Sequence, residues 1–182
     1  MSRQGWQELI NWVVADGTAI SATTTETIVF PNVTIPANYM QDGRVLAITA
    51  YGRHTSAGQT VTDRVRWGGV AGTVITASGA TVAPTATAAL WETTAVIQTR
   101  SNGATGTVFA MGQQVIYDDV VSTAGSATGA PAVAGLGSAG LTTPAAVTVD
   151  LTADTSLSFT KQFGTAGSNA VTGHIYILES KN

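Results

Sequence analysis

Residues 90–111 read LWETTAVIQTRSNGATGTVFAM, and this stretch decides the class of fold. From Leu90 to Arg100 apolar and polar side chains alternate, which is the period-two pattern of a strand with one buried face. Asn102-Gly103 follows, and this dipeptide is typical of tight hairpin turns because both residues tolerate a positive φ. The chain then returns through a second alternating stretch, Thr105 to Met111. The segment therefore predicts an antiparallel β-hairpin.

The same pattern recurs along the rest of the chain, where turn residues separate short alternating stretches. Beside Leu90–Arg100, the predicted strands are Arg44–Arg53, Val61–Trp67, Thr73–Ala77, Thr105–Tyr117, Val147–Leu151, Ser156–Phe163 and Gly173–Glu179. About eight or nine strands at a spacing of roughly 8–15 residues favour an antiparallel β-sandwich over a βαβ architecture. We expect residues 18–182 to form one all-β domain of this kind.

The segment Val61–Trp67 alternates so that Asp63 shares a face with the apolar residues, while Arg64 and Arg66 share the opposite face. These two arginines are the closest pair of basic residues in the chain. A pair is too little for a track that follows nucleic-acid phosphates, and the net charge of −3 points the same way. We expect no nucleic-acid partner.

The chain has few charged residues and is rich in threonine, alanine, valine, serine and glycine. Only 10% of the residues are charged, against about 25% in an average soluble domain. The chain has no cysteine, which excludes a disulfide framework and a thiolate metal site. A surface with so little charge indicates a β-sheet body that packs against neighbours, through self-association into a closed ring of copies.

The first seventeen residues predict a short helical segment, residues 1–17. Trp6, Leu9, Ile10 and Val13 recur at helical spacing and give one apolar stripe. We interpret these four residues as partner-binding anchors, with a lid over one end of the β-body as the alternative. The chain shows no apolar leader before a small-residue cleavage site and no membrane-spanning run, so we expect no membrane partner.

Residues 121–144 differ from the remainder because they consist almost wholly of Ser, Thr, Ala, Gly and Pro, with two valines and two leucines. Loops longer than about 15 residues are usually functional or mobile. We interpret the segment as an extended arm that lies on a surface, such as that of a neighbouring subunit, and a mobile loop is the alternative.

Three motifs resemble catalytic or ligand-binding sites, but the sequence around each lacks the pattern that such a site requires. Gly135, Gly137 and Gly140 match G-x-G-x-x-G, but no βαβ pattern surrounds them. Asp118-Asp119 has no metal-binding pattern around it, and we read it as a solvated turn. His54 and His174 lack a nucleophile elbow or a metal-ligand spacing. We therefore expect no enzyme, no cofactor and no metal site.

Several stretches resemble small virion proteins of tailed bacteriophages. They are Phe30-Pro31, Thr34–Tyr39, Gly43–Leu46, Thr49–Arg53, Gly103–Thr107 and His174–Glu179. In those proteins a Thr-rich strand crosses through a Thr-Ile-Pro segment into a strand that opens with Gly-Arg. The resemblance covers most of residues 18–179 and lies in composition and turn placement. It implies a jelly-roll-like β-sandwich with a structural role on the particle, often as a homotrimer.

Three functions compete on these grounds. The first is a capsid decoration or cement protein that binds the major capsid protein or another virion protein and stabilises the shell by bridging capsid subunits. The second is a tail or fibre-tip module that recognises host glycan through exposed aromatic side chains. The third is a virion hydrolase, which the missing catalytic constellation disfavours. All three place the protein in the virion after synthesis in the host cytoplasm.

Overall fold

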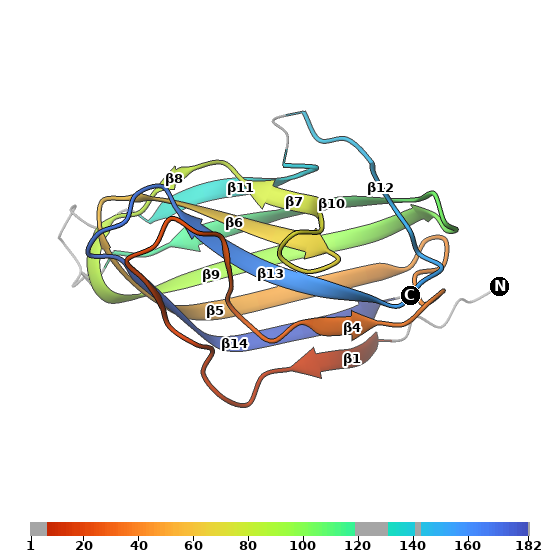
Figure 1. The fold of residues 1–182 in the computed structure, drawn as a ribbon, viewed down its shortest axis with the longest axis horizontal. Helices are drawn as coiled ribbons and strands as arrows, with labels where there is room; N and C mark the ends of the chain where they lie inside the picture. The colour runs from red at the N-terminus through yellow and green to blue at the C-terminus, as the bar shows by residue number, and fades with distance from the viewer. Residues whose placement is uncertain (1–6, 119–130, 141–142, 182) are drawn as a thin grey trace.

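The computed structural model describes residues 7–118, 131–140 and 143–181, which form a single antiparallel β-sheet of fourteen strands that does not close (Figure 1). The strands are β1 (Gln7–Trp12), β2 (Ile20–Ser21), β3 (Thr27–Ile28), β4 (Val33–Ile35), β5 (Val45–Ala57), β6 (Thr60–Trp67), β7 (Thr73–Ser78), β8 (Thr81–Val82), β9 (Thr85–Ser101), β10 (Gly106–Ile116), β11 (Ala132–Ser138), β12 (Val147–Val149), β13 (Thr155–Phe163) and β14 (Ala170–Lys181). The described residues contain no helix. The all-β, antiparallel prediction is confirmed.

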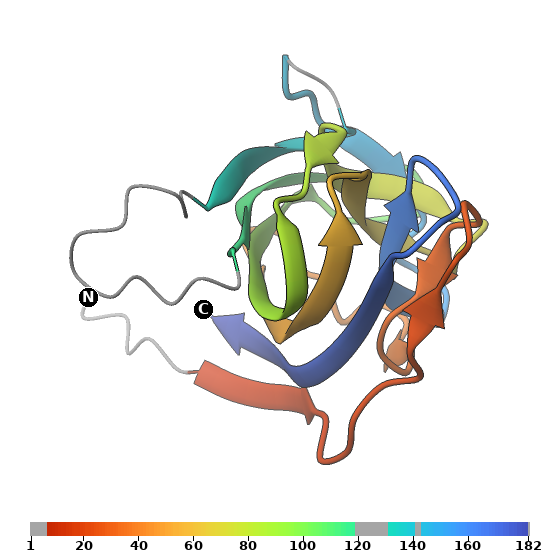
Figure 2. The same cartoon turned by 90° about the vertical axis from the view of Figure 1, so that its left-hand side faces the viewer.

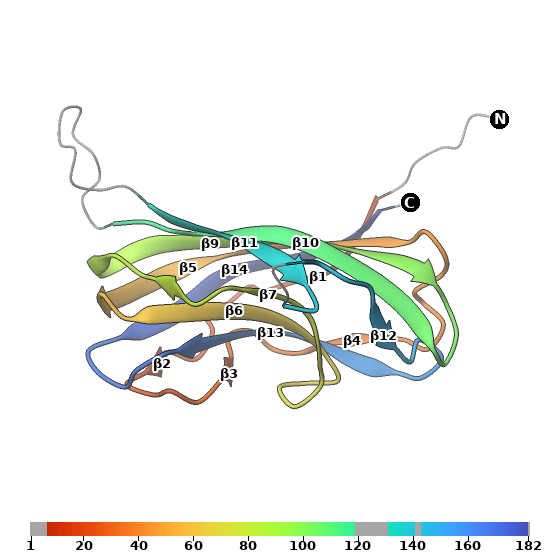
Figure 3. The same ribbon diagram turned by 90° about the horizontal axis from the view of Figure 1, so that it is seen from above.

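The sheet curls over itself, and its two halves enclose the core (Figures 2 and 3). Hydrogen-bonded neighbours follow the order β1-β14-β5-β9-β10-β11-β7-β6-β13-β3. We call β1, β14, β5, β9 and β10 the first half of the sheet, and β11, β7, β6, β13 and β3 the second half. The short strands β2, β4, β8 and β12 pair beside this path.

The predicted hairpin is confirmed as β9 and β10, which pair over most of their lengths. Gly103 has a φ of 108°, the left-handed region that the turn requires of its glycine. Every other predicted strand also coincides with an observed one, within a few residues at the ends. Leu46, Ile48 and Ala50 are buried on β5, as the alternation predicts.

The predicted helix is wrong for the described part of residues 1–17. Residues 7–12 form β1, which pairs with β14 at one margin of the sheet. The register shifts between Leu9 and Asn11, which indicates a β-bulge at this point. With this bulge, Ile10 and Val13, three residues apart, both pack against the core, and a spacing of three imitates a helix. Trp6 lies outside the described residues.

The predicted arm, residues 121–144, is described only in part. Ala132–Ser138 forms β11, which is hydrogen-bonded to β10 on one side and to β7 on the other. This part of the segment therefore belongs to the chain's own sheet and joins its two halves. Residues 119–130 and 141–142 lie outside the described part.

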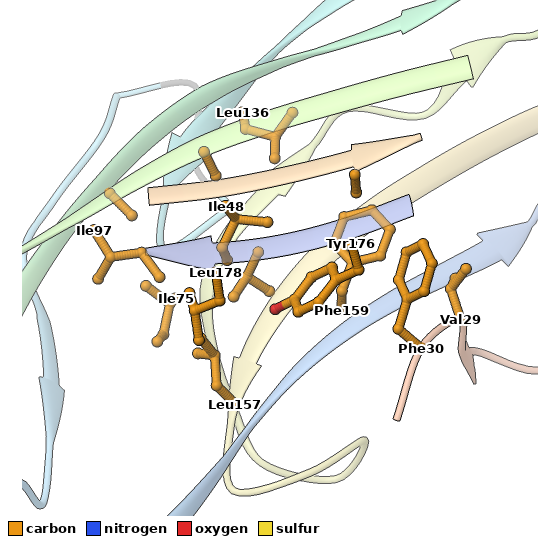
Figure 4. Packing of buried hydrophobic residues seen from close by; sticks show 14 of the residues in the cluster. Val29, Phe30, Ile48, Ile75, Ile97, Leu136, Leu157, Phe159, Tyr176 and Leu178 are labelled. Atoms are coloured by element: carbon orange, nitrogen blue, oxygen red, sulfur yellow. The ribbon is translucent and has the colours of Figure 1, made fainter. Parts of the chain in front are cut away.

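Four aromatic rings pack together in the core. They belong to Trp91 and to Phe30, Phe159 and Tyr176, the last three of which are labelled in Figure 4. Phe30 stacks on Tyr176 with 5.0 Å between ring centroids, and Trp91 stacks on Phe159 at 5.9 Å. Trp91 comes from β9 and Phe159 from β13, so this contact joins the two halves of the sheet.

A pair of glycines makes room for these rings. Gly52 on β5 and Gly173 on β14 are opposite each other in the register. A Cβ on Gly173 would lie 2.4 Å from Phe30, and a Cβ on Gly52 would lie 2.7 Å from the Trp91 ring. The absence of both side chains is thus what allows two aromatic rings to pack against the backbone of the first half.

We predict that Gly173→Ala destabilises the protein because its methyl group forces the Phe30 ring out of place. Overpacking of this kind typically costs about 1–3 kcal/mol. Gly135→Ala on β11 is the matched control, because a Cβ there meets no atom within 4 Å. Chemical denaturation followed by tryptophan fluorescence measures both variants. Equal midpoints for the two variants would contradict the prediction.

Candidate interaction surface

The predicted anchor residues do not form one stripe on the folded chain. Leu9 is 50% exposed, whereas Ile10 and Val13 are partly buried and pack against the core. Trp12, which we did not single out from the sequence, is 56% exposed and lies on the same face as Leu9. The exposed anchors of β1 are therefore Leu9 and Trp12.

A groove of ≈ 500 Å³ adjoins the end of β1. Its walls are residues 11–18 on one side and residues 28–31, which follow β3, on the other. Hydrogen bonds from the amide of Val13 to the carbonyl of Tyr176 and from Gly17 to Gly173 hold residues 13–17 beside β14. Val14 on this segment is 88% exposed. The groove thus has a fixed backbone frame and an exposed apolar side chain beside it.

Leu9 and Trp12 continue into a larger apolar surface on the outer face of the first half of the sheet. Direct cross-strand partners place two rows of side chains on this face, one row being Trp12, Ile177, Thr49, Thr94 and Gln113, and the next being Leu9, Glu179, Ala47, Val96 and Met111. We call these ten residues the uncovered face. Glu179 is the single ionisable side chain among them.

Part of the outer face of the second half, over β6 and β13, is covered by the chain itself. Glu26, which precedes β3, lies over β6 and β13 and accepts hydrogen bonds from Arg66 at 2.5 and 2.7 Å. Arg64 donates to the same carboxylate at 3.2 Å and Thr160 at 2.5 Å. The two arginines share a face, as predicted, and Glu26 neutralises part of their charge.

This environment changes the pKa of Glu26. Burial raises the pKa, but the hydrogen bonds from Arg66 and Thr160 and the charges of Arg64 and Arg66 outweigh it and bring the pKa below the ordinary value of 4.5. The folded protein then binds fewer protons than the unfolded chain between the two pKa values. The stabilisation from Glu26 is fully present above pH 4.5 and is lost as the pH falls through the folded pKa.

We predict that Glu26→Gln destabilises the protein at pH 7 and that this difference shrinks as the pH falls below 4.5. The reason is that protonation removes the same charge from the original side chain. Urea titrations at a series of pH values from 7 to 3 give the free energy of unfolding of both proteins. Two curves that stay parallel below pH 4.5 would show that Glu26 has an unshifted pKa.

His174 lies between two charged side chains. Its Nδ1 is 2.5 Å from Asp16 Oδ1, and Arg53 Nε donates to its Nε2 at 3.0 Å. Nε2 therefore carries a lone pair in this arrangement, and Nδ1 carries the proton. A hydrolytic histidine needs that lone pair to take a proton from a nucleophile. Because Arg53 donates a hydrogen bond to this lone pair, His174 instead links Asp16 to Arg53 of β5 from its own position on β14.

The remaining motifs of the sequence, namely His54, the G-x-G-x-x-G glycines and Asp118-Asp119, show no arrangement typical of a catalytic or ligand-binding site in the described residues. His54 is buried, with Nε2 2.8 Å from the carbonyl oxygen of Tyr117. Gly135 and Gly137 lie within β11 and Gly140 in the turn after it, so no helix N-terminus follows the G-x-G-x-x-G pattern. Asp119 lies outside the described residues. Within residues 7–118, 131–140 and 143–181, no three His, Asp or Glu side chains gather where they could hold a metal ion.

One buried polar cluster was missed from the sequence. The Nζ atom of Lys161 lies 2.7 and 2.8 Å from the two carboxylate oxygens of Asp63, its direct cross-strand partner. Thr93, on the opposite half of the sheet, donates to the same carboxylate at 2.5 Å. Lys161 is 1% exposed, and its Nζ lies 3.8 Å from the centroid of the Trp91 ring. Burial lowers the pKa of Lys161, and the charge of Asp63 acts in the opposite direction.

We predict that Lys161→Met destabilises the protein by about 3–5 kcal/mol, because it leaves the Asp63 carboxylate buried without its counter-ion. Lys181→Met is the control, since Lys181 pairs with Glu179 at the surface at 3.6 Å, where an ion pair contributes about 0–1 kcal/mol. Thermal and chemical denaturation measure both variants. The combined change Lys161→Met with Asp63→Leu should recover part of the loss, and a loss equal to that of the single variant would argue against an unpaired charge.

No protein-family model matches this chain, and no curated protein matches it. In the described part of the chain, no helix is long and apolar enough to cross a membrane.

Proposed function

We propose that this protein is a structural protein of a tailed-phage virion, a capsid decoration or cement protein that self-associates and bridges capsid subunits. The observation that carries the proposal is the uncovered face, in which nine of ten side chains are uncharged. A binding surface without charges suits permanent packing between subunits better than catalysis or transient encounter. The resemblance of residues 30–53 to small virion proteins of tailed phages is the reason for proposing a tailed-phage virion as the particle.

The pairing of strands supports a jelly-roll-like body. β9 pairs with β10, β7 with β11, β6 with β13 and β5 with β14, so later strands return beside progressively earlier ones. A jelly roll is a double-sheet arrangement of antiparallel strands joined by Greek-key connections. The nested pairs are what a long hairpin that rolls up on itself would give.

The groove beside β1 is the surface that we assign to the particle. It combines the exposed Val14 with a rigid frame of hydrogen bonds to β14. We infer that the major capsid protein, or another virion protein, binds there while the copies of this chain associate as a homotrimer. The protein would then be made in the host cytoplasm and act in the virion, with no catalytic role and no cofactor.

A host-glycan-binding module at the tail is the alternative, and one observation favours it. Trp12 is more than half exposed at the edge of the groove, next to Asn11 and Asp16 among the lining residues. In such a site the aromatic ring stacks on a sugar, and the neighbouring amide and carboxylate oxygens accept hydrogen bonds from the sugar hydroxyls. The position of the protein on the particle distinguishes the two functions.

We predict that Val14→Asp weakens binding to parent particles at least tenfold, because it places a charge in an apolar contact. Val82→Asp is the matched control, since Val82 is 61% exposed on β8, away from the groove. Co-sedimentation of purified protein with particles that lack it measures binding, and electron microscopy locates the added density. Density over the capsid lattice supports decoration, and density confined to the tail tip would overturn it in favour of the glycan-binding module.

A further inference from the structure

The two halves of the sheet differ in how much of their outer face the chain covers. On the second half, residues 24–32 cover β13, with hydrogen bonds from Gln162 to the Thr24 carbonyl at 3.0 Å and from Ser158 to Asn32 at 2.6 Å. On the uncovered face, Val96 is 49% exposed and Met111 is 56% exposed. The described part of the chain therefore leaves this face open to solvent.

The uncovered face is electrically neutral. Its one charged side chain, Glu179, lies 3.6 Å from the Lys181 ammonium group and also accepts a hydrogen bond from Gln7. The other nine side chains of the face are Trp, Leu, Ile, Val, Met, Ala, Gln and two Thr. A partner rich in charge would have to desolvate its ions here without any counter-ion. The face therefore fits a neutral partner surface, and a second copy of this chain supplies one.

The face is large enough for the centre of such a contact. Five strands at a spacing of about 4.8 Å span about 24 Å, and two rows of side chains cover about 14 Å along the strands. This gives on the order of 350 Å², so an interface of the standard ~800 Å² per partner would extend onto the neighbouring rows of the same strands. Small side chains in the middle, such as Ala47 and Thr49, allow a second sheet to approach to the ~10 Å that is usual between packed sheets.

We propose that the uncovered face is the self-association interface of this protein, where it packs against a second copy of the same chain. This rests on the self-association included in the proposed function and names the surface that performs it. The groove beside Val14 shares Trp12 with the face, but Val14 and residues 28–31 of its lining lie outside the face and remain available for the particle.

The absence of cysteine from the chain allows a direct test. Val96→Cys places one thiol on the uncovered face, and Val82→Cys places one on an exposed valine of β8. In a monomer both thiols would react with a maleimide at similar rates. If copies pack on the face, we expect the thiol at position 96 to react at least tenfold more slowly than the thiol at position 82.

Light scattering after size-exclusion chromatography of the full chain at micromolar concentration provides the second measurement. We expect a whole multiple of the 18.5 kDa chain mass, and Val96→Asp should shift it to a monomer while Val82→Asp leaves it unchanged. Circular dichroism confirms that both variants stay folded, and Val96→Thr, which keeps the side-chain shape, replaces Val96→Asp if the latter does not fold.

A monomer with equal thiol reactivity at both positions would overturn the inference, as would an oligomer that survives the change at Val96 and leaves position 96 reactive. These outcomes are separate from the proposed function. A monomer that still decorates the capsid would leave that function standing, and an oligomer that binds no particle would remove the function while the interface stands.

Discussion

The Asp63 carboxylate is the group on which the arrangement of the two halves depends. It is fully buried, and it holds Lys161 from its own half and Thr93 from the opposite half at the same time. A charge in this position is tolerated only when all these partners are in place. A slip of β9 by one residue would move Thr93 to the outer face and leave the carboxylate one partner short. The cluster therefore selects one register between the halves, which apolar packing alone would select less sharply.

The aromatic cluster extends this constraint. Trp91 lies under the Lys161 ammonium group and stacks on Phe159, and its ring occupies the space that Gly52 leaves. The ion pair, the ring and the glycine thus come from four strands, β6, β13, β9 and β5, and each requires the others in place. Five of the nineteen Asp, Glu, Lys and Arg side chains belong to this cluster and to the Glu26 cluster. Both clusters lie in or on the second half, whereas the ten residues of the uncovered face on the first half include one charged side chain, Glu179.

The sequence predicted the strands well, because their alternation is strict and their turns carry Gly. It also placed Asp63 on the inner face, although the need for a buried counter-ion there was not drawn from it. The N-terminal segment failed for a definite reason, since the bulge after Leu9 produces a spacing of three on a strand. β11 was missed because Ala and Gly make up most of it, and a strand of small residues has no visible alternation. The uncovered face requires the register of five strands, which single-strand patterns do not contain.

The nested strand pairs have a consequence for the time at which the fold can form. Among the described strands, β9 and β10 form one hairpin with a short turn and β6 and β7 form another, so these pairs are available as soon as they are synthesised. β5 must wait for β14, about 120 residues later, before it gains its neighbour on that side. All-β topologies with such distant partners fold in milliseconds to seconds, whereas helical bundles reach microseconds. During that interval the edge of β5 and the apolar residues of β9 stay exposed on the nascent chain, and chaperone binding or early contact between sister chains would protect them.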